Sequence, residues 1–133
     1  MARRVVFDTN VLVSGYLWRG FARKALEKVR SGEWILLVST DAINELIRVL
    51  AYHKFGLTPT EIQPIVQDLA TFSEFVEVKT QVEIIKSDPT DNIFLALAID
   101  GDADGIVSGD HHLIDLKKFK GIPIVSVRQF LSQ

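Results

Sequence analysis

The chain has 133 residues, of which 47% are hydrophobic and 24% charged, and its formal net charge is −2. It has no cysteine, which excludes disulfides, zinc–thiolate sites and cysteine nucleophiles. The N-terminal segment has too short an apolar run for a signal-peptide core, and no later run reaches membrane-spanning length. We therefore expect a soluble, cytoplasmic protein made of one domain, residues 1–133.

Positive charge gathers at the beginning of the sequence. Residues 1–30 contain seven basic and two acidic residues, whereas the rest of the chain contains eight basic and fifteen acidic ones. A basic region beside an acidic site suits a polyanionic substrate held near metal ions. The alternative is that four of these basic residues only form the solvated face of a helix: Arg23, Lys24, Lys28 and Arg30.

The first half of the chain alternates between short apolar runs and helical patterns. The expected elements are a strand at Arg3–Phe7, a short helical segment after Asp8, a helix at Phe21–Arg30, a strand at Trp34–Val38 and a helix at Asp41–His53. Val5–Phe7 within the first strand and the whole of Trp34–Val38 are continuous apolar runs without alternation. Such runs are typical of parallel strands covered on both faces.

The second half continues the alternation. Thr58-Pro59-Thr60-Glu61 combines an N-cap threonine, a proline at the first helical position and a capping-box glutamate, so a helix begins there. The later elements are a weaker edge strand at Phe75–Val78, a helix from Asp88 to Asp100, strands at Gly105–Ser108 and Ile122–Val125, and a short helix from Ser126 through Leu131. This order predicts an α/β fold with a mainly parallel sheet and helices on both faces.

Four acidic residues fall where a site would form in such a sheet. Asp8 directly follows the first strand, and Asp110 follows the strand expected at Gly105–Ser108. Glu45 lies about one turn into the helix after the second strand, and Asp91 lies in the first turn of its helix. Open parallel sheets bind ligands outside the carboxyl ends of their strands. We therefore expect the four carboxylates to meet at that edge.

Clustered carboxylates repel one another unless a cation offsets their charge. Oxygen ligands favour Mg²⁺ or Mn²⁺, and such ions activate water and orient phosphates, as phosphodiester hydrolysis requires. Each acid also has a purely structural interpretation. Asp91 could complement a helix dipole, Asp8 and Asp110 could be turn residues, and Glu45 could face solvent.

Four segments in order resemble the motifs of the PIN-domain family of nucleases, especially the toxin-like members of prokaryotic toxin–antitoxin pairs. These segments are Val5–Ser14, Asn44–Leu50, Asp88–Ala98 and Ala103–Asp110, the last followed by His111-His112-Leu113-Ile114. The resemblance extends from Val5 to about Phe130. It implies a three-layer α/β/α sandwich around a mainly parallel sheet.

The resemblance also implies an activity and a site. It implies an endoribonuclease that depends on Mg²⁺ or Mn²⁺ and cuts single-stranded RNA, often as a homodimer, with a cognate antitoxin that blocks the site. The metal ligands and catalytic residues would be Asp8, Glu45, Asp91 and Asp110. Thr9, Asn10 and Ser108 would support them, with the Ser108 hydroxyl bonding a neighbouring carboxylate.

Several residues near these motifs are candidates for contact with substrate. Arg19 and Arg23 follow the helical segment after Asp8, so we expect them to bind RNA phosphates. Trp18, in an expected loop, could stack on bases. His111 and His112 lie near the rim of the site, where an ordinary surface role is expected.

Other enzyme and binding classes fit less well. Haloacid-dehalogenase-like phosphatases need a second aspartate at the position of Asn10, and receiver domains need a lysine where this chain has Ile124-Val125-Ser126. A dinucleotide-binding domain needs a glycine-rich turn after the first strand, which is absent here. A catalytically inactive PIN-like module that binds RNA or protein stays as the alternative, although the presence of all four acids argues against it.

Overall fold

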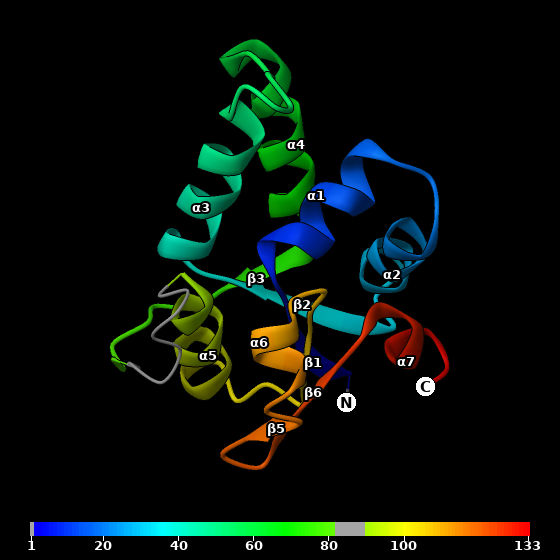
Figure 1. Ribbon diagram of the computed structural model, residues 1–133, viewed down its shortest axis with the longest axis vertical. Helices are drawn as coiled ribbons and strands as arrows, with labels where there is room; N and C mark the ends of the chain where they lie inside the picture. Colours follow the sequence, from blue (N-terminus) through cyan, green and yellow to red (C-terminus); the bar gives the residue numbers. More distant parts are fainter. Residues whose placement is uncertain (1, 82–89) are drawn as a thin grey trace.

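A mainly parallel sheet forms the centre of the computed structural model, which describes residues 2–81 and 90–133. Across the described residues its strand order is β3-β2-β1-β4-β6-β5 (Figure 1), and β5 alone runs antiparallel to its neighbour. The strands are β1 (Arg3–Phe7), β2 (Trp34–Val38), β3 (Ser73–Phe75), β4 (Gly105–Val107), β5 (Lys118–Phe119) and β6 (Ile122–Val125). Because β1, β2 and β4 are parallel, their carboxyl ends share one edge of the sheet.

The expected bounds of β1, β2 and β6 are confirmed, and β4 ends one residue earlier than predicted, although Ser108 N still donates to the carbonyl of Val125 in β6 (3.0 Å). The prediction of a strand at Phe75–Val78 was wrong in its bounds. The edge strand is Ser73–Phe75, which pairs with Leu36–Val38, and beyond it the ladder gains one further bond from Val76 N to the carbonyl of Val38 (2.8 Å). Its position at the sheet edge is confirmed.

Seven helices are found in the described parts of the chain. They are α1 (Thr9–Leu17), α2 (Phe21–Arg30), α3 (Thr40–Ala51), α4 (Pro59–Phe72), α5 (Asp91–Asp100), α6 (His111–Ile114) and α7 (Val127–Leu131). Helix α3 starts one residue before the predicted Asp41 and ends two residues before His53, while Asp88, the expected start of α5, lies outside the described residues. No helix in residues 2–81 and 90–133 is long and apolar enough to cross a membrane.

Side chains at helix N-termini explain where the helices begin. The predicted capping box of α4 is present: Thr58 Oγ1 accepts from Glu61 N (3.3 Å), and Glu61 Oε1 accepts from Thr58 N (2.9 Å). Ser39 caps α3 after β2, and Ser126 caps α7 after β6 in a second capping box. Polar caps therefore follow the parallel strands at the same edge of the sheet.

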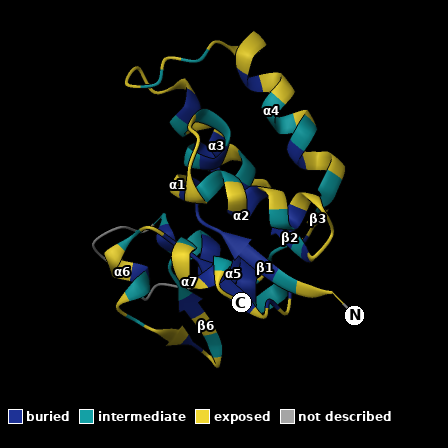
Figure 2. Ribbon diagram, turned by 90° about the vertical axis from the view of Figure 1, so that its right-hand side faces the viewer, coloured by how far each residue is buried: buried dark blue, intermediate teal, exposed yellow. Residues whose placement is uncertain are grey.

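Helices cover both faces of the sheet, which confirms the α/β/α arrangement. Along β1, Val5 and Phe7 point into one core with residues of α1, α2, α3, α4 and α7, and Val6 points into a second core with residues of α5 and α6. Figure 2 shows that the strands at the centre are almost wholly buried, while the outer faces of the helices are exposed. Helices α3 and α4 pack together and extend away from the sheet (Figure 1).

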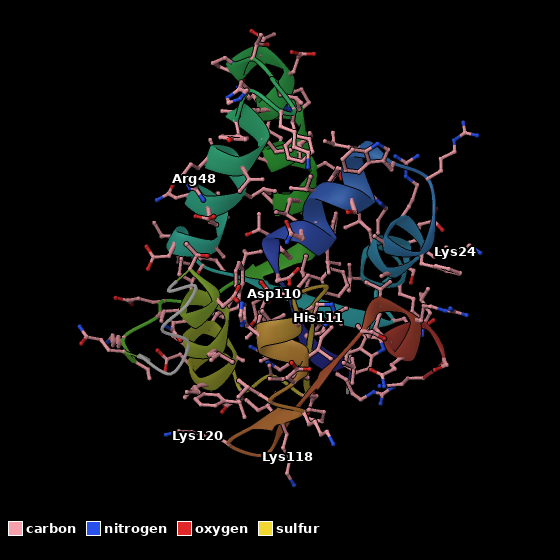
Figure 3. All side chains as sticks on the ribbon, in the orientation of Figure 1. Lys24, Arg48, Asp110, His111, Lys118 and Lys120 are labelled. Atoms are coloured by element: carbon pink, nitrogen blue, oxygen red, sulfur yellow. The ribbon has the colours of Figure 1, made fainter. Side chains whose placement is uncertain are left out.

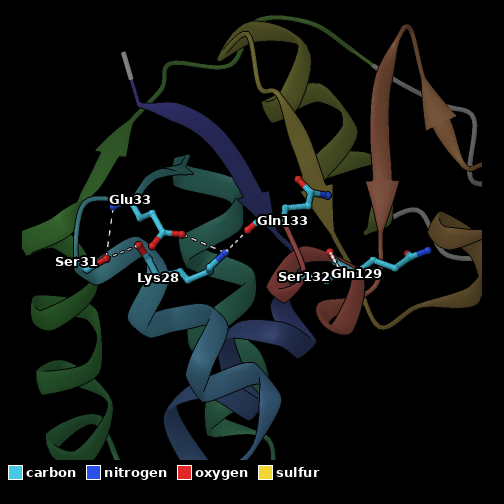
Figure 4. A network of polar contacts seen from close by, with 6 residues as sticks. All are labelled: Lys28, Ser31, Glu33, Gln129, Ser132 and Gln133. Carbon is cyan, nitrogen blue, oxygen red and sulfur yellow. Dashed lines mark hydrogen bonds and ion pairs between the residues drawn. The ribbon is translucent and has the colours of Figure 1, made fainter.

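A polar network joins α2 to the C-terminal segment. Lys28 Nζ donates to the backbone carbonyl of Gln133 (2.8 Å) and lies 3.1 Å from the Glu33 carboxylate (Figure 4). Ser31 closes the turn between them, since its hydroxyl donates to the carbonyl of Lys28 (2.9 Å). The Lys28 side chain also lies over the ring of Phe130. Lys28 therefore connects α2 to α7 and the C-terminal segment, and its side chain is only 17% exposed.

A second network joins α1, α2 and α4. The Asp68 carboxylate accepts from the Tyr16 hydroxyl (2.7 Å) and from Arg30 Nη1 (2.5 Å). The hydrogen bond from Arg30 lowers the pKa of the Asp68 carboxyl below its ordinary value. Both partners of this ion pair are partly exposed, so its contribution to stability is modest.

We expect Asp68→Asn to lower the free energy of unfolding at pH 7 by about 1 kcal/mol or less. A carboxyl whose pKa is lowered on folding stabilises the native state above its unfolded pKa, and this stabilisation is lost as pH falls through the folded pKa. The difference between wild type and variant in urea denaturation should therefore shrink below about pH 4. Asp115→Asn, at an exposed acid, is the control, and a difference that stays constant with pH would contradict the assignment.

Candidate functional site

Asp8 is held at the end of β1 by three donors from different parts of the chain. Its Oδ1 accepts from Val11 N (3.0 Å), which makes Asp8 the N-cap of α1. Its Oδ2 accepts from the Ser108 hydroxyl and from Gly109 N (3.2 Å), both in the loop after β4. The side chain is buried, with only 3% of its residue surface exposed. The orientation of this carboxylate is therefore determined by the start of α1 and by the loop after β4.

Ser108 links Asp8 to Asp110. The Ser108 hydroxyl donates to Asp8 and accepts from Asp110 N (2.9 Å), so the prediction that it bonds a neighbouring carboxylate is confirmed. Asp110 is the N-cap of α6, with Oδ1 accepting from His112 N (2.7 Å). A single serine therefore connects the half-buried Asp110 to Asp8 by hydrogen bonds.

Glu45 reaches the same place from α3. Its side chain is only 11% exposed and forms a two-pronged ion pair with Arg48, one turn further along the helix. The contacts are Arg48 Nη2 to Glu45 Oε1 at 2.5 Å and Arg48 Nε to Glu45 Oε2 at 3.1 Å. The interpretation that Glu45 faces solvent was therefore wrong.

Asp91 is the first residue of α5 and is buried, with 5% of its surface exposed. Helix α5 is apolar along most of its length and packs on β1, β2, β4 and α3, so it is enclosed on several sides. Because the helix begins at Asp91, this carboxylate lies at the end of α5 that faces the site.

One cavity of about 270 Å³ brings the four acids together: Asp8, Glu45, Asp91 and Asp110 all line it. Its wall also includes the side chains of Thr9, Asn10, Thr90 and Arg48, with apolar contributions from Val49 and Phe94. The cavity opens at the carboxyl edge of the sheet, between α1, α3, α5 and the start of α6. Figure 3 shows Asp110 and His111 at that start and Arg48 on α3.

Among the four acids of the cavity, Asp8 has a carboxyl whose pKa is raised. Burial raises the pKa of the Asp8 carboxyl above its ordinary value, and the negative charge of Asp110 acts in the same direction. The hydrogen bonds from Ser108, Val11 and Gly109 oppose this effect without overcoming it. A cation in the cavity would favour the charged form of Asp8.

The donors around the cavity fit a hard divalent cation by their chemistry. They are carboxylate, hydroxyl and amide oxygens, and the buried Thr9 hydroxyl has no hydrogen-bond partner among the described residues. In residues 2–81 and 90–133, however, no three His, Asp or Glu side chains are placed to hold a metal ion together. Asp8 and Glu45 are turned to the protein donors Ser108 and Arg48.

Other residues expected at the site lie outside the cavity. Arg23 is half-buried, and its guanidinium donates to the carbonyls of Gly15 (3.2 Å) and Tyr16 (3.1 Å) near the end of α1. Arg19 is exposed in the loop before α2, and neither arginine lines the cavity. Their binding of RNA stays a prediction. Trp18 is 51% exposed and contacts the ring of Phe55 edge-on, so part of its surface is free for other contacts.

Arg48 is a charged residue of the cavity wall that was not predicted from the sequence. A signal was present, because residues three apart on a helix lie on the same face and Arg48 follows Glu45 at that spacing. The spacing alone does not assign Arg48 to the site, because the sequence does not show that Glu45 lines a cavity.

Comparison with known proteins agrees with this fold. A family model described as PIN domain matches residues 4–112. Since the match covers most of the sequence, the chain belongs to the PIN-domain family. No curated protein matches the sequence.

Three solved structures share the fold. VapBC2 from Rickettsia felis, bound to a DNA fragment from the promoter, superposes with a TM-score of 0.64 at 13% identity over 92% of this chain and 98% of that one. PAE2754 from Pyrobaculum aerophilum superposes with a TM-score of 0.63 at 14% identity, over 98% of this chain and 88% of that one. VapC20 from Mycobacterium tuberculosis, a Sarcin-Ricin loop cleaving toxin, gives 0.57 at 11% over 90% and 98%.

We expect Ser108→Ala to lower the free energy of unfolding by about 1–3 kcal/mol at pH 7. The change removes a donor to the buried Asp8 and the acceptor for Asp110 N, and the buried carboxylate cannot recruit bulk water in exchange. Ser108→Thr keeps the hydroxyl and should retain most of the stability. Ser132→Ala, at an exposed serine, is the control in urea denaturation. Equal stability of the two alanine variants would show that this contact does not hold the site together.

Proposed function

We propose that this protein is a metal-dependent endoribonuclease with one catalytic domain. The observation that carries the proposal is the convergence of four carboxylates from four separate segments on one cavity at the carboxyl edge of the sheet. Burying one of these acids beside another is unfavourable without a cation, so the arrangement has a cost in stability that a purely structural cap would not require. Membership of the PIN-domain family supports the same conclusion.

The residues proposed to hold Mg²⁺ or Mn²⁺ are Asp8, Asp91 and Asp110, with Glu45 as a fourth ligand directly or through water. A divalent cation bound there supplies positive charge that activates water and stabilises the phosphate during phosphodiester hydrolysis. The chain itself orients the acids. Ser108 holds Asp8 and the backbone of Asp110, α5 begins at Asp91, and Arg48 pairs with Glu45. The Asn10 amide and the Thr9 hydroxyl line the same wall and can position water or substrate.

Single-stranded RNA is the proposed substrate, and the proposed setting is a toxin–antitoxin pair. The motif resemblance to toxin-like family members supports both, as does the shared fold with a Sarcin-Ricin loop cleaving toxin. A cognate antitoxin that covers the cavity and a homodimer are part of this proposal. A catalytically inactive module that binds RNA or protein is the alternative, and the cleavage test separates the two.

Asp8→Asn and Asp110→Asn should each reduce cleavage of a short unstructured RNA to background in Mg²⁺ or Mn²⁺. Both changes remove a negative charge at the cavity while keeping the shape of the side chain. Cleavage is followed on a gel, and circular dichroism checks that the fold is kept. Asp115→Asn removes a charge from the end of α6 and should cleave like wild type. Full activity in either cavity variant would exclude the assignment, and an inactive wild type that still binds RNA would favour the alternative module.

Mg²⁺ or Mn²⁺ should raise the melting temperature of the wild-type protein, because a ligand that binds only the native state stabilises it by mass action. At a free concentration one hundred times the dissociation constant, the gain is about 2.7 kcal/mol. The shift should be much smaller in Asp8→Asn and unchanged in Asp115→Asn. A wild-type melting curve that ignores both ions at millimolar concentration would count against a metal site.

A further inference from the structure

We propose that Arg48 is the phosphate-binding residue of the cavity, and that it exchanges Glu45 for an RNA phosphate when a divalent cation binds Glu45. The inference rests on the proposed nuclease function and assigns a role to a residue outside the acidic set. It follows from three features of the Glu45–Arg48 pair: its geometry, its uneven exposure and its position among the other charges.

The geometry of the pair uses both prongs of the guanidinium. Nη2 and Nε of Arg48 contact the two oxygens of Glu45 at 2.5 and 3.1 Å. A planar guanidinium presents the same fork to a phosphate, which offers two oxygens at similar spacing. The donor geometry that now engages Glu45 therefore also suits a phosphodiester.

The two partners differ sharply in exposure. The Glu45 side chain is 11% exposed and that of Arg48 is 64% exposed, although both line the cavity. Glu45 is thus fixed in the wall, while Arg48 closes over it from the solvent side. An exposed arginine on a long flexible stem can change partner without disturbing the helix, and a cation that takes its place keeps the largely buried Glu45 carboxylate paired with a positive charge.

The charge balance of the cavity gives the exchange a direction. Among the described residues that line the cavity, four are acidic and Arg48 is the only basic one. In the metal-free protein Arg48 offsets part of the acidic charge at Glu45. A divalent cation competes for the same carboxylate, and once it is bound the guanidinium lies at the mouth of the cavity, where an incoming phosphate brings negative charge.

This model predicts opposite effects of one substitution on two ligands. Arg48→Ala removes the competitor for Glu45, so Mn²⁺ should bind the RNA-free protein several-fold more tightly in calorimetry. The same change removes a phosphate contact, so KM for a short RNA should rise about tenfold. The slope of log kcat/KM against log salt should become shallower by about 0.7, the value for one phosphate on a single strand.

Matched variants separate this role from a structural one. Arg48→Lys keeps the charge but loses the fork, so KM should lie between those of wild type and Arg48→Ala. In a Glu45→Gln background, removal of Arg48 should no longer change Mn²⁺ affinity, because the competition needs Glu45. Lys118→Ala removes one positive charge from β5, at the sheet edge farthest from β3, and should change neither quantity.

The outcomes are distinct. If Arg48→Ala weakens Mn²⁺ binding, Arg48 orients Glu45 as a ligand and the exchange is excluded. If it changes neither Mn²⁺ affinity nor KM while wild type binds the ion and cleaves RNA, the proposed role of Arg48 fails and the nuclease function stands. If wild type neither binds Mn²⁺ nor cleaves RNA, the proposed function fails and the role of Arg48 fails with it.

Discussion

The buried carboxylate of Asp8 is the constraint on which the arrangement of this site depends. It ends β1, begins α1 through Val11 N, and accepts hydrogen bonds from Ser108 and Gly109 after β4. One side chain therefore sets the direction of a helix and the path of a loop on the adjacent strand. The loop in turn presents Asp110, so the separation of two acids from distant parts of the sequence follows from the hydrogen bonds of the first. Packing of the apolar strands brings β1 and β4 together, and the Asp8 carboxylate determines the path of the chain after each of them.

The same edge of the sheet shows how caps can double as functional groups. Ser39 and Ser126 follow β2 and β6 and only begin helices, whereas Asp8 and Asp110 begin helices and also face the cavity. At Asp110 the structural and functional interpretations are compatible, because the cap uses only one of the two carboxylate oxygens. In Asp110, Oδ1 accepts from His112 N and the second oxygen is available for other contacts.

Much of this architecture could be predicted from the sequence, for physical reasons that differ between elements. The bounds of β2 and β6 follow from uninterrupted apolar runs, β1 follows from the apolar run Val5–Phe7 behind two arginines, and the start of α4 follows from the capping box at Thr58. Strand β5 could not be predicted, because two residues such as Lys118 and Phe119 carry no periodicity and pair only because a turn brings them beside β6. The sequence allowed the four acids to be assigned to one edge of the sheet, but it did not predict the hydrogen-bond and ion-pair partners of each acid. That Glu45 pairs with Arg48 and Asp8 with Ser108 depends on rotamers and burial, which only the packed structure determines.

Among the described residues the sheet ends on both sides in short strands, β3 with three residues and β5 with two. Exposed backbone at a sheet edge is a template for uncontrolled pairing with another chain, and short edges limit it. Glu74 in β3 and Lys118 in β5 also place charge on these margins, where a flat apolar edge would invite fibril-like stacking. The longer apolar strands β1, β2 and β6 lie between β3 and β5, which separate them from neighbouring molecules. Short, charged edges of this kind disfavour the extension of the sheet from one molecule into the next.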